Sequence, residues 1–322
     1  MNIQEITALV GEDFSKTNTL IHQSLGCELP LIENIGNYIV DNGGKRLRPL
    51  MVLLMSNALG YKGSFHIHTA AIVELIHTAT LMHDDVVDKS SLRRGHKTAN
   101  NIWGNAISVL TGDFLYSRAF QLMVTINDMR VLDVLANASN LIATGEVEQL
   151  AYCHNANTTL DHYLSVIEKK TAKLFEAACR LPAILQNTNP VLESQCANYG
   201  KLIGIAFQLI DDVMDYTADE TTMGKHIGDD LAEGKPTMPM IHALKKGSPT
   251  QCKILTSAIT EGKTTQLNDI ITILYELGSI SFTHQQTEKY IALAIDNLAS
   301  LPQSDYRDAL ISLANHTASR VS

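Results

Sequence analysis

Apolar residues recur at intervals of three and four along nearly the whole chain, and runs of strict alternation are scarce. This spacing gathers apolar side chains on one face of a helix, whereas a half-buried strand has a period of two. A first apolar stripe runs from Ile3 to Phe14, and a second covers Leu31 to Val40. Further helices are predicted over residues 66–88, 100–127, 130–153, 160–186, 191–218, 237–246, 250–260, 264–277, 279–299 and 304–319. The short connections favour an all-α fold, an antiparallel helix bundle.

Two acidic motifs of the form DDxxD each follow an apolar run, at residues 84–88 and 211–215. Residues four apart lie within about 40° of each other around a helix, so Asp84 and Asp88 share a face, as do Asp211 and Asp215. Like charges at that spacing destabilise an isolated helix, and their burial costs more unless a cation neutralises them. The pattern predicts a metal site, although two solvated acidic helix ends would give the same sequence pattern.

The residue types in these motifs narrow the choice of metal. The candidate ligands are carboxylate oxygens, and no cluster of Cys or His accompanies them, which favours Mg²⁺ over Zn²⁺. Mg²⁺ takes one or two carboxylates per ion and completes its octahedron with water and substrate phosphates. Two acidic faces therefore suggest a diphosphate held between two helices.

A polar segment follows each acidic motif and resists a helical interpretation. Residues 89–97 include Gly95, and residues 219–236 include Gly224, Gly228 and Gly234. Segments of this kind can close over a bound ligand, or they can be ordinary surface connections.

Basic residues gather beside the same segments. They comprise Lys45, Arg46, Arg48, Arg93, Arg94, Lys169, Lys170, Lys225 and Lys235. Arg donates in a rigid fork that fits phosphate oxygens and Lys acts as a movable point charge, although a charge run is more often a solvated face. The sequence Gly43-Gly44-Lys45 is not a Walker loop, because the spacing differs and no strand precedes it.

Two further polar residues share the faces of the aspartates. His77 lies seven residues, or two turns, before Asp84, and Gln208 lies three residues before Asp211. A lone His on an apolar helix is more often a core residue, so its candidacy depends on the motifs around it.

Composition excludes several classes of protein. The 322 residues are 45% hydrophobic and 18% charged with a net charge of −9, which argues against nucleic acid as a partner. The first residues lack the features of a signal peptide, and no run of about 18 apolar residues could form a transmembrane segment. Five cysteines without a CxxC pair fit reduced thiols in the cytoplasm. We expect one domain over residues 1–322.

Six segments together resemble the trans-polyprenyl diphosphate synthases, in that family's order and over nearly the whole chain. They are Gly43-Gly44-Lys45-Arg46-Leu47-Arg48-Pro49, His83-Asp84-Asp85-Val86-Val87-Asp88, Arg93-Arg94-Gly95, Lys170-Thr171, Phe207-Gln208-Leu209-Ile210-Asp211-Asp212 and Lys235-Pro236-Thr237. The chain looks most like the bacterial members that make the side chain of ubiquinone or menaquinone. The resemblance implies an isoprenoid synthase-type helix bundle around a deep central cavity, usually as a homodimer.

The resemblance also implies roles for individual residues. Mg²⁺ would be held by Asp84, Asp88 and Asp211, which with Lys170 and Arg93 would form the catalytic set. An allylic diphosphate, expected to be farnesyl diphosphate, would bind Arg93, Lys170, Thr171, Gln208, Lys225 and Lys235. The diphosphate of isopentenyl diphosphate would bind Lys45, Arg48, His77 and Arg94. Asp85 and Asp212 lie about 100° off the metal face, so we expect them, with Asp215, to orient the ligands.

The implied activity is the repeated head-to-tail condensation of isopentenyl diphosphate onto the allylic primer, giving a long all-trans chain with octaprenyl as the expected length. In short-chain relatives a bulky aromatic residue four or five positions before the first motif closes the product tunnel, whereas this chain has Ala79 and Thr80 there. A class I terpene cyclase and a non-catalytic subunit of a partner synthase are alternatives; the second DDxxD and the complete basic set favour the synthase. Peripheral contact with a membrane for product release stays open.

Overall fold

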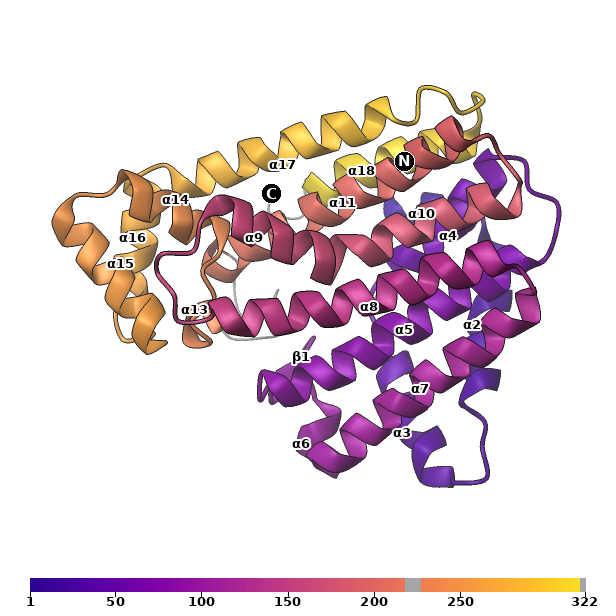
Figure 1. Ribbon diagram of the computed structural model, residues 1–322, viewed down its shortest axis with the longest axis horizontal. Helices are drawn as coiled ribbons and strands as arrows, with labels where there is room; N and C mark the ends of the chain where they lie inside the picture. Colours follow the sequence, from indigo (N-terminus) through magenta and orange to yellow (C-terminus); the bar gives the residue numbers. More distant parts are fainter. Residues whose placement is uncertain (218–226, 319–322) are drawn as a thin grey trace. The chain divides into compact units, whose positions relative to one another are not determined.

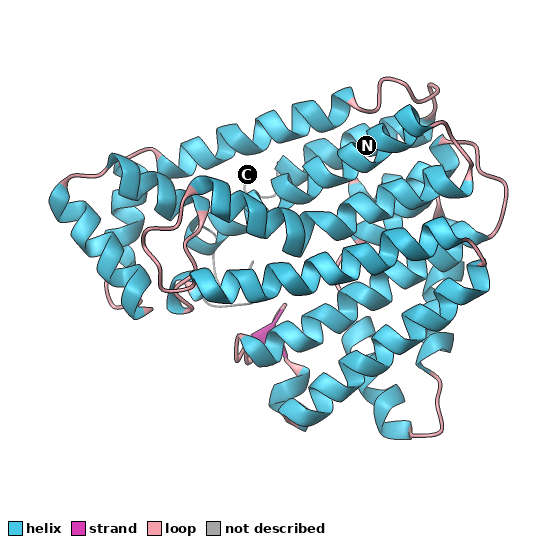
Figure 2. Cartoon of the chain, viewed as in Figure 1, coloured by secondary structure: helices cyan, strands magenta, loops and turns pink. Residues whose placement is uncertain are grey.

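The computed structural model describes residues 1–217 and 227–318, and most of these residues are helical (Figure 1). The one sheet in these ranges is a hairpin of two short strands, β1 (Leu92–Arg93) and β2 (His96–Lys97), drawn in magenta in Figure 2. The all-α fold predicted from the apolar spacing is confirmed.

Contacts within the chain divide it into two compact units. The first comprises residues 1–139, 174–200 and 297–313, and the second comprises the described parts of 140–173, 201–296 and 314–322. Three helices extend well into both units: α8 (Met129–Tyr152), α11 (Pro190–Thr217) and α18 (Asp305–Ala318). The single domain expected from the sequence stays a prediction.

The first unit is built around one long buried helix. Its other elements are α1 (Ile3–Ala8), α2 (Gly11–Leu25), α3 (Pro30–Asp41), α4 (Leu47–Ala58), α6 (Ala99–Trp103), α7 (Asn105–Ile126) and most of α10 (Lys173–Leu185). The buried helix is α5 (Phe65–Val87), which contacts α2, α4 and α7 and is buried on every side over residues 69–76. A helix that is apolar all round belongs in a core. The first acidic motif therefore lies where this core helix ends.

Local backbone geometry divides two of the elements predicted in this unit. The stripe from Ile3 to Phe14 covers two helices, because α1 ends at Ala8 and α2 begins at Gly11. The predicted helix 100–127 is interrupted at Gly104, because its φ of 86° is incompatible with a right-handed helix.

The polar segment 89–97, predicted to be a loop, contains the β1–β2 hairpin. Its two turn residues, Arg94 and Gly95, have φ values of 53° and 78°. Two consecutive left-handed residues are what a two-residue hairpin turn requires.

The second unit packs short helices around α14 (Met238–Lys246), which contacts α9, α15, α16 and α17. The elements around it are α9 (Leu160–Ile167), α13 (Asp229–Ala232), α15 (Pro249–Glu261), α16 (Leu267–Glu276) and α17 (Ser279–Asp296). The second half of α11 contributes Leu209, Val213 and Tyr216 to the buried clusters of this unit. The second acidic motif, at residues 211–215, is thus part of the unit's core.

Two predicted segments that lie wholly or partly in the second unit differ from the structure. The helix predicted over 160–186 contains a π-helix at Glu168–Ala172, between α9 and α10. The segment 219–236, predicted to be non-helical, includes the short helix α13. Lys225 lies outside the described residues.

Candidate active site

The three aspartates of the first motif differ in accessibility. Asp84 and Asp88 are half-buried, whereas Asp85 is 2% exposed. Arg93 donates from both Nε and Nη2 to Asp85 Oδ1, each at 2.8 Å. Burial raises the pKa of Asp85, and the attraction of Arg93 opposes that rise. Asp85 therefore anchors the hairpin to α5, while Asp84 and Asp88 remain accessible.

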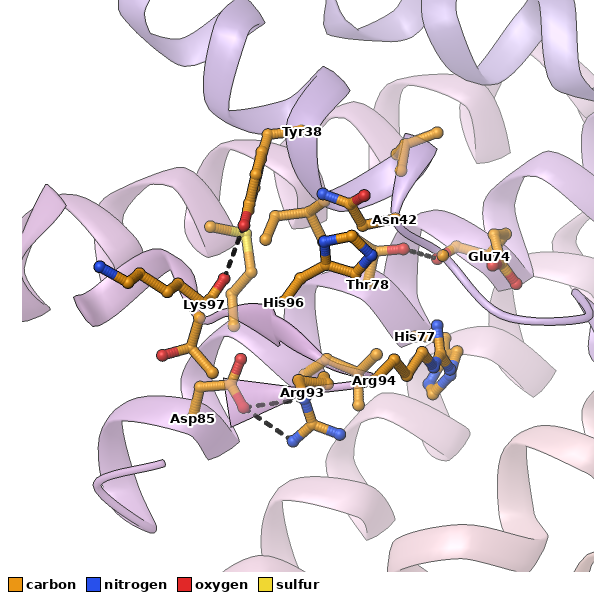
Figure 3. Close-up of a pocket in the computed structure, with 16 residues that line it drawn as sticks. Tyr38, Asn42, Glu74, His77, Thr78, Asp85, Arg93, Arg94, His96 and Lys97 are labelled. Atoms are coloured by element: carbon orange, nitrogen blue, oxygen red, sulfur yellow. Dashed lines mark hydrogen bonds and ion pairs between the residues drawn. The ribbon is translucent and has the colours of Figure 1, made fainter. Parts of the chain in front are cut away.

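A pocket in the first unit lies between α5, the end of α3 and the hairpin (Figure 3). We call it the arginine pocket, and its polar lining includes Glu74, His77, Arg93 and Arg94. Burial lowers the pKa of His77 well below its usual value, and Arg48, Arg94 and Arg93 lower it further. His77 is therefore neutral at pH 7 and can donate one hydrogen bond to an anion.

Three arginines connect the segment around the diglycine to its neighbours. A Cβ at Gly44 would lie 2.7 Å from Cζ of Arg94, so that guanidinium lies directly on the glycine backbone. Arg46 donates to the carbonyl of Val40 at 2.9 Å and to Asn18. Arg48 lies 4.1 Å above the ring of Phe175, a cation–π contact.

The structure brings together only part of the set predicted for isopentenyl diphosphate. His77 and Arg94 line the arginine pocket, and Arg93 lines it too. Lys45 is exposed and Arg48 is half-buried, and neither is part of the pocket lining.

A second pocket, in the second unit, gathers most of the residues predicted for the allylic diphosphate. We call it the lysine pocket; its lining includes Lys170, Thr171, Gln208, Asp212, Asp230 and Lys235. Thr171 Oγ1 donates to Gln208 Oε1 at 2.9 Å, and Gln208 Nε2 donates to Asp212 Oδ1 at 2.9 Å. These bonds link two segments 37 residues apart in sequence into one polar wall.

Lys170 is held by the neighbouring helix. Its Nζ donates to Glu146 Oε2 at 2.6 Å and to Gln149 Oε1 at 2.8 Å, both on α8. The ion pair keeps the ammonium group at the pocket wall. Lys235 pairs in a similar way with Glu233.

The second acidic motif is more buried than the first. Asp211 is half-buried, whereas Asp212 is 2% exposed and Asp215 is completely buried. Burial, reinforced by the charge of Asp230, raises the pKa of Asp212 to about 7. Tyr163 donates its hydroxyl to Asp212, and the backbone N–H of Asp230 donates to Asp215 Oδ2 at 3.2 Å. Although Asp211 and Asp215 are one turn apart, only Asp211 is accessible, because the segment from Gly228 to Asp230 covers Asp215.

Within the described ranges, no group of three or more His, Cys, Asp or Glu side chains is placed to hold a metal ion by itself. Mg²⁺ does not need such a cluster, because water and substrate phosphates supply most of its ligands. Half-buried carboxylates one turn apart, such as Asp84 and Asp88, are hard oxygen donors of the kind it prefers.

Sequence reasoning missed several polar residues of these pockets. They are Glu74 in the arginine pocket, and Glu146, Gln149, Tyr163 and Asp230 in or beside the lysine pocket. The only sequence signal was spacing: Glu74 lies three residues before His77, and Glu146 lies three before Gln149. Such spacing is common on surface helices, so it did not single them out.

Comparison with known proteins resolves the family. Residues 29–277 match the model of the polyprenyl synthetase family. The chain belongs to that family. It is 44% identical over 321 residues to octaprenyl diphosphate synthase of Escherichia coli K12, covering 99% of both chains.

Solved structures of polyprenyl synthases share the fold over the full length of the chain. The decaprenyl diphosphate synthase of Rhodobacter capsulatus superposes with a TM-score of 0.95 at 40% identity, covering 100% of both chains. A polyprenyl synthase from Caulobacter crescentus CB15, complexed with calcium and isoprenyl diphosphate, gives a TM-score of 0.96 at 38% identity, covering 100% of this chain and 98% of that one. The chain is a trans-prenyltransferase of the long-chain type, which joins isopentenyl diphosphate to an allylic diphosphate.

Proposed function

We propose that the chain makes octaprenyl diphosphate, by adding isopentenyl diphosphate repeatedly to farnesyl diphosphate, and that the product becomes the side chain of a quinone. The observation that carries the proposal is the 44% identity to the E. coli octaprenyl diphosphate synthase over 99% of both chains. The two pockets, with guanidinium groups in one and ammonium groups in the other, supply the kind of donors that bind diphosphates.

Mg²⁺ is the metal we assign to the acidic motifs, with Asp84, Asp88 and Asp211 as its ligands. All three carboxylates are half-buried and therefore reachable by an ion. Mg²⁺ would neutralise the charge that develops on the departing diphosphate. Asp85 keeps Arg93 in place, and the bonds of Asp212 to Gln208 and Tyr163 orient the wall beside Asp211.

The basic residues would form two groups, one for the diphosphate of each substrate. We assign the allylic diphosphate to Arg93, Lys170, Thr171, Gln208, Lys225 and Lys235, and the diphosphate of isopentenyl diphosphate to Lys45, Arg48, His77 and Arg94. These side chains stabilise the leaving diphosphate more than the bound ester, which is how electrostatic catalysis gains rate.

The reaction follows from that charge distribution. The C–O bond of the allylic ester breaks, the double bond of isopentenyl diphosphate attacks the allylic cation, and the released diphosphate accepts the proton that is lost. The new chain is five carbons longer and carries the diphosphate of the isopentenyl unit. Apolar walls keep water from quenching the cation.

We further propose that the chain acts as a homodimer, as one functional domain over residues 1–322, in the cytoplasm. Large apolar side chains are exposed on α7, including Leu110 and Val124, which supports a partner surface there. All five cysteines are free thiols, which supports a reducing compartment. No helix in the described ranges is long and apolar enough to cross a bilayer.

The test is to incubate the purified chain with farnesyl diphosphate, labelled isopentenyl diphosphate and Mg²⁺, and to measure product length. A long linear polyprenyl diphosphate is expected, and a chelator should abolish its formation while circular dichroism stays unchanged. A cyclised hydrocarbon would identify a terpene cyclase. No product without a second protein would identify a non-catalytic subunit.

A further inference from the structure

Glu74 is a buried carboxylate in the wall of the arginine pocket (Figure 3). It lies on α5 one turn before His77 and is 7% exposed. Its Oε2 atom is buried and has no hydrogen-bond partner. Burying an ionised carboxylate without hydrogen bonds is costly, and pairing or function usually accounts for it.

Three guanidinium groups attract this carboxylate through space, those of Arg46, Arg48 and Arg94. Their attraction lowers the pKa of Glu74, but burial has the larger effect and raises it overall. Each guanidinium has its own contact elsewhere: Arg46 with Val40, Arg48 with Phe175, and Arg94 with Gly44. Each arginine therefore has a contact besides its attraction to Glu74, and Glu74 adds an acidic group to a pocket of guanidinium groups.

We propose that the Glu74 carboxylate limits how tightly the arginine pocket holds the diphosphate of isopentenyl diphosphate. The inference depends on the assignment of that diphosphate to this pocket in the proposed function. A diphosphate beside His77 and Arg94 shares the pocket with Glu74, and two anions repel each other more strongly inside a protein than in water.

Weakened binding serves a reaction that repeats. After each condensation the elongated chain carries the diphosphate of the isopentenyl unit, so it still occupies the pocket where that substrate bound. It must leave this pocket before the next isopentenyl diphosphate can enter. A pocket of guanidinium groups alone would hold the diphosphate of the elongated product more tightly and slow its departure, and tight binding of that kind does not raise turnover.

The experiment measures binding of isopentenyl diphosphate to the full chain by calorimetry at pH 8, without allylic substrate so that no reaction occurs. Glu74→Gln and Glu74→Met both remove the charge at similar volume, and both should bind at least about fivefold more tightly than the wild type. Glu74→Asp keeps the charge and should bind within about twofold of the wild type.

A second measurement follows elongation with excess isopentenyl diphosphate. Glu74→Gln should show a lower kcat, a lower KM for isopentenyl diphosphate and shorter products, because each product leaves the pocket more slowly. A merely structural defect would not tighten binding. Glu193→Gln is the matched control, since Glu193 is also buried in the first unit but pairs with Arg130 and Arg180. It should lower the melting temperature and leave the affinity for isopentenyl diphosphate unchanged.

Unchanged or weaker binding in the two uncharged variants would overturn the inference. Weaker binding would mean that Glu74 holds the arginines in position instead. A failure of the proposed function looks different, because the wild type itself would then neither bind isopentenyl diphosphate nor elongate farnesyl diphosphate.

Discussion

At the scale of single residues, neighbours in the first acidic motif have different surroundings. Asp84 is half-buried and reachable, while Asp85 is 2% exposed and accepts two hydrogen bonds from Arg93. The 100° between consecutive residues on a helix separates them. We therefore assign metal binding to Asp84, whereas Asp85 supports the hairpin.

Replacing Asp84 with Ala should lower turnover at least about a thousandfold, or about 4 kcal/mol of barrier, because a metal ligand is lost. Steady-state kinetics with farnesyl and isopentenyl diphosphates measure the effect. Asp133→Ala, at an exposed aspartate on α8, is the control and should keep wild-type turnover. Near-normal turnover of the Asp84 variant would remove it from the metal site.

His77 should make the stability of the unliganded protein depend on pH. Its pKa is lowered from 6.5 in the folded state, so as the pH falls below about 6.5 only the unfolded state takes up the proton. The free energy of unfolding should then decrease towards pH 5 more steeply in the wild type than in His77→Gln. Urea unfolding at several pH values between 5 and 8 compares the two slopes, and parallel curves would contradict this assignment.

Aromatic substitutions before the first motif should shorten the product. Thr80 is half-buried one turn before Asp84, and Ala79 is completely buried. Thr80→Phe and Ala79→Phe should each give shorter polyprenyl diphosphates by mass spectrometry, although overpacking at Ala79 should also cost about 1–3 kcal/mol of stability. Thr80→Val, similar in volume, should leave the length unchanged. Full-length product from both Phe variants would mean that the growing chain runs elsewhere.

At the scale of elements, a π-helix presents Lys170 and Thr171 to the lysine pocket. Helix α8 packs closely against it at Gly145, where a Cβ would lie 2.7 Å from the backbone nitrogen of Lys170. The same helix supplies Glu146 and Gln149, which hold the Lys170 ammonium group. Close packing and the ion pair therefore both position Lys170. Short π-helical segments are frequent at functional sites.

Gly145→Ala should force α8 and the π-helix apart. We expect a loss of about 1–3 kcal/mol in the free energy of unfolding, as is usual for overpacking, together with a higher KM for the allylic diphosphate. Urea unfolding and steady-state kinetics measure the two effects. Gly11→Ala is the matched control, because a Cβ there meets no atom within 4 Å. Equal behaviour of the two variants would show that the close approach is unimportant.

At the scale of the whole molecule, the exposed apolar side chains of α7 can be buried only by contact with another molecule. Leu110 is 65% exposed and Val124 is 71% exposed on this helix. A second copy of the chain is the partner we propose, because two identical faces can cover each other around a two-fold axis.

Leu110→Asp should therefore weaken self-association at least about tenfold, since each copy would bring an unpaired charge into the interface. Sedimentation equilibrium measures the dissociation constant. Val191→Asp is the control, because Val191 is equally exposed, at 69%, but lies on α11. A chain that is monomeric before substitution, or a dimer that Leu110→Asp leaves intact, would exclude α7 as the interface.

The sequence by itself determined the all-α class, most helix positions, the two acidic motifs and the family's set of basic residues. These properties are local, because the helical period and the spacing of a motif involve residues within a few turns of each other. The break at Gly104 was missed, because it arises from a positive φ that the apolar spacing does not reveal, and the π-helix at Glu168–Ala172 was missed as well.

Only the tertiary structure decided which polar groups meet. Lys170 is held by Glu146 from 24 residues away, and Tyr163 reaches Asp212 from a distance of 49 residues. Glu74, in the middle of an apolar helix, acquires its surroundings from the arginines of two other segments. Burial and charge at a carboxylate depend on side chains that folding brings together, and the period of a single helix holds no information about them.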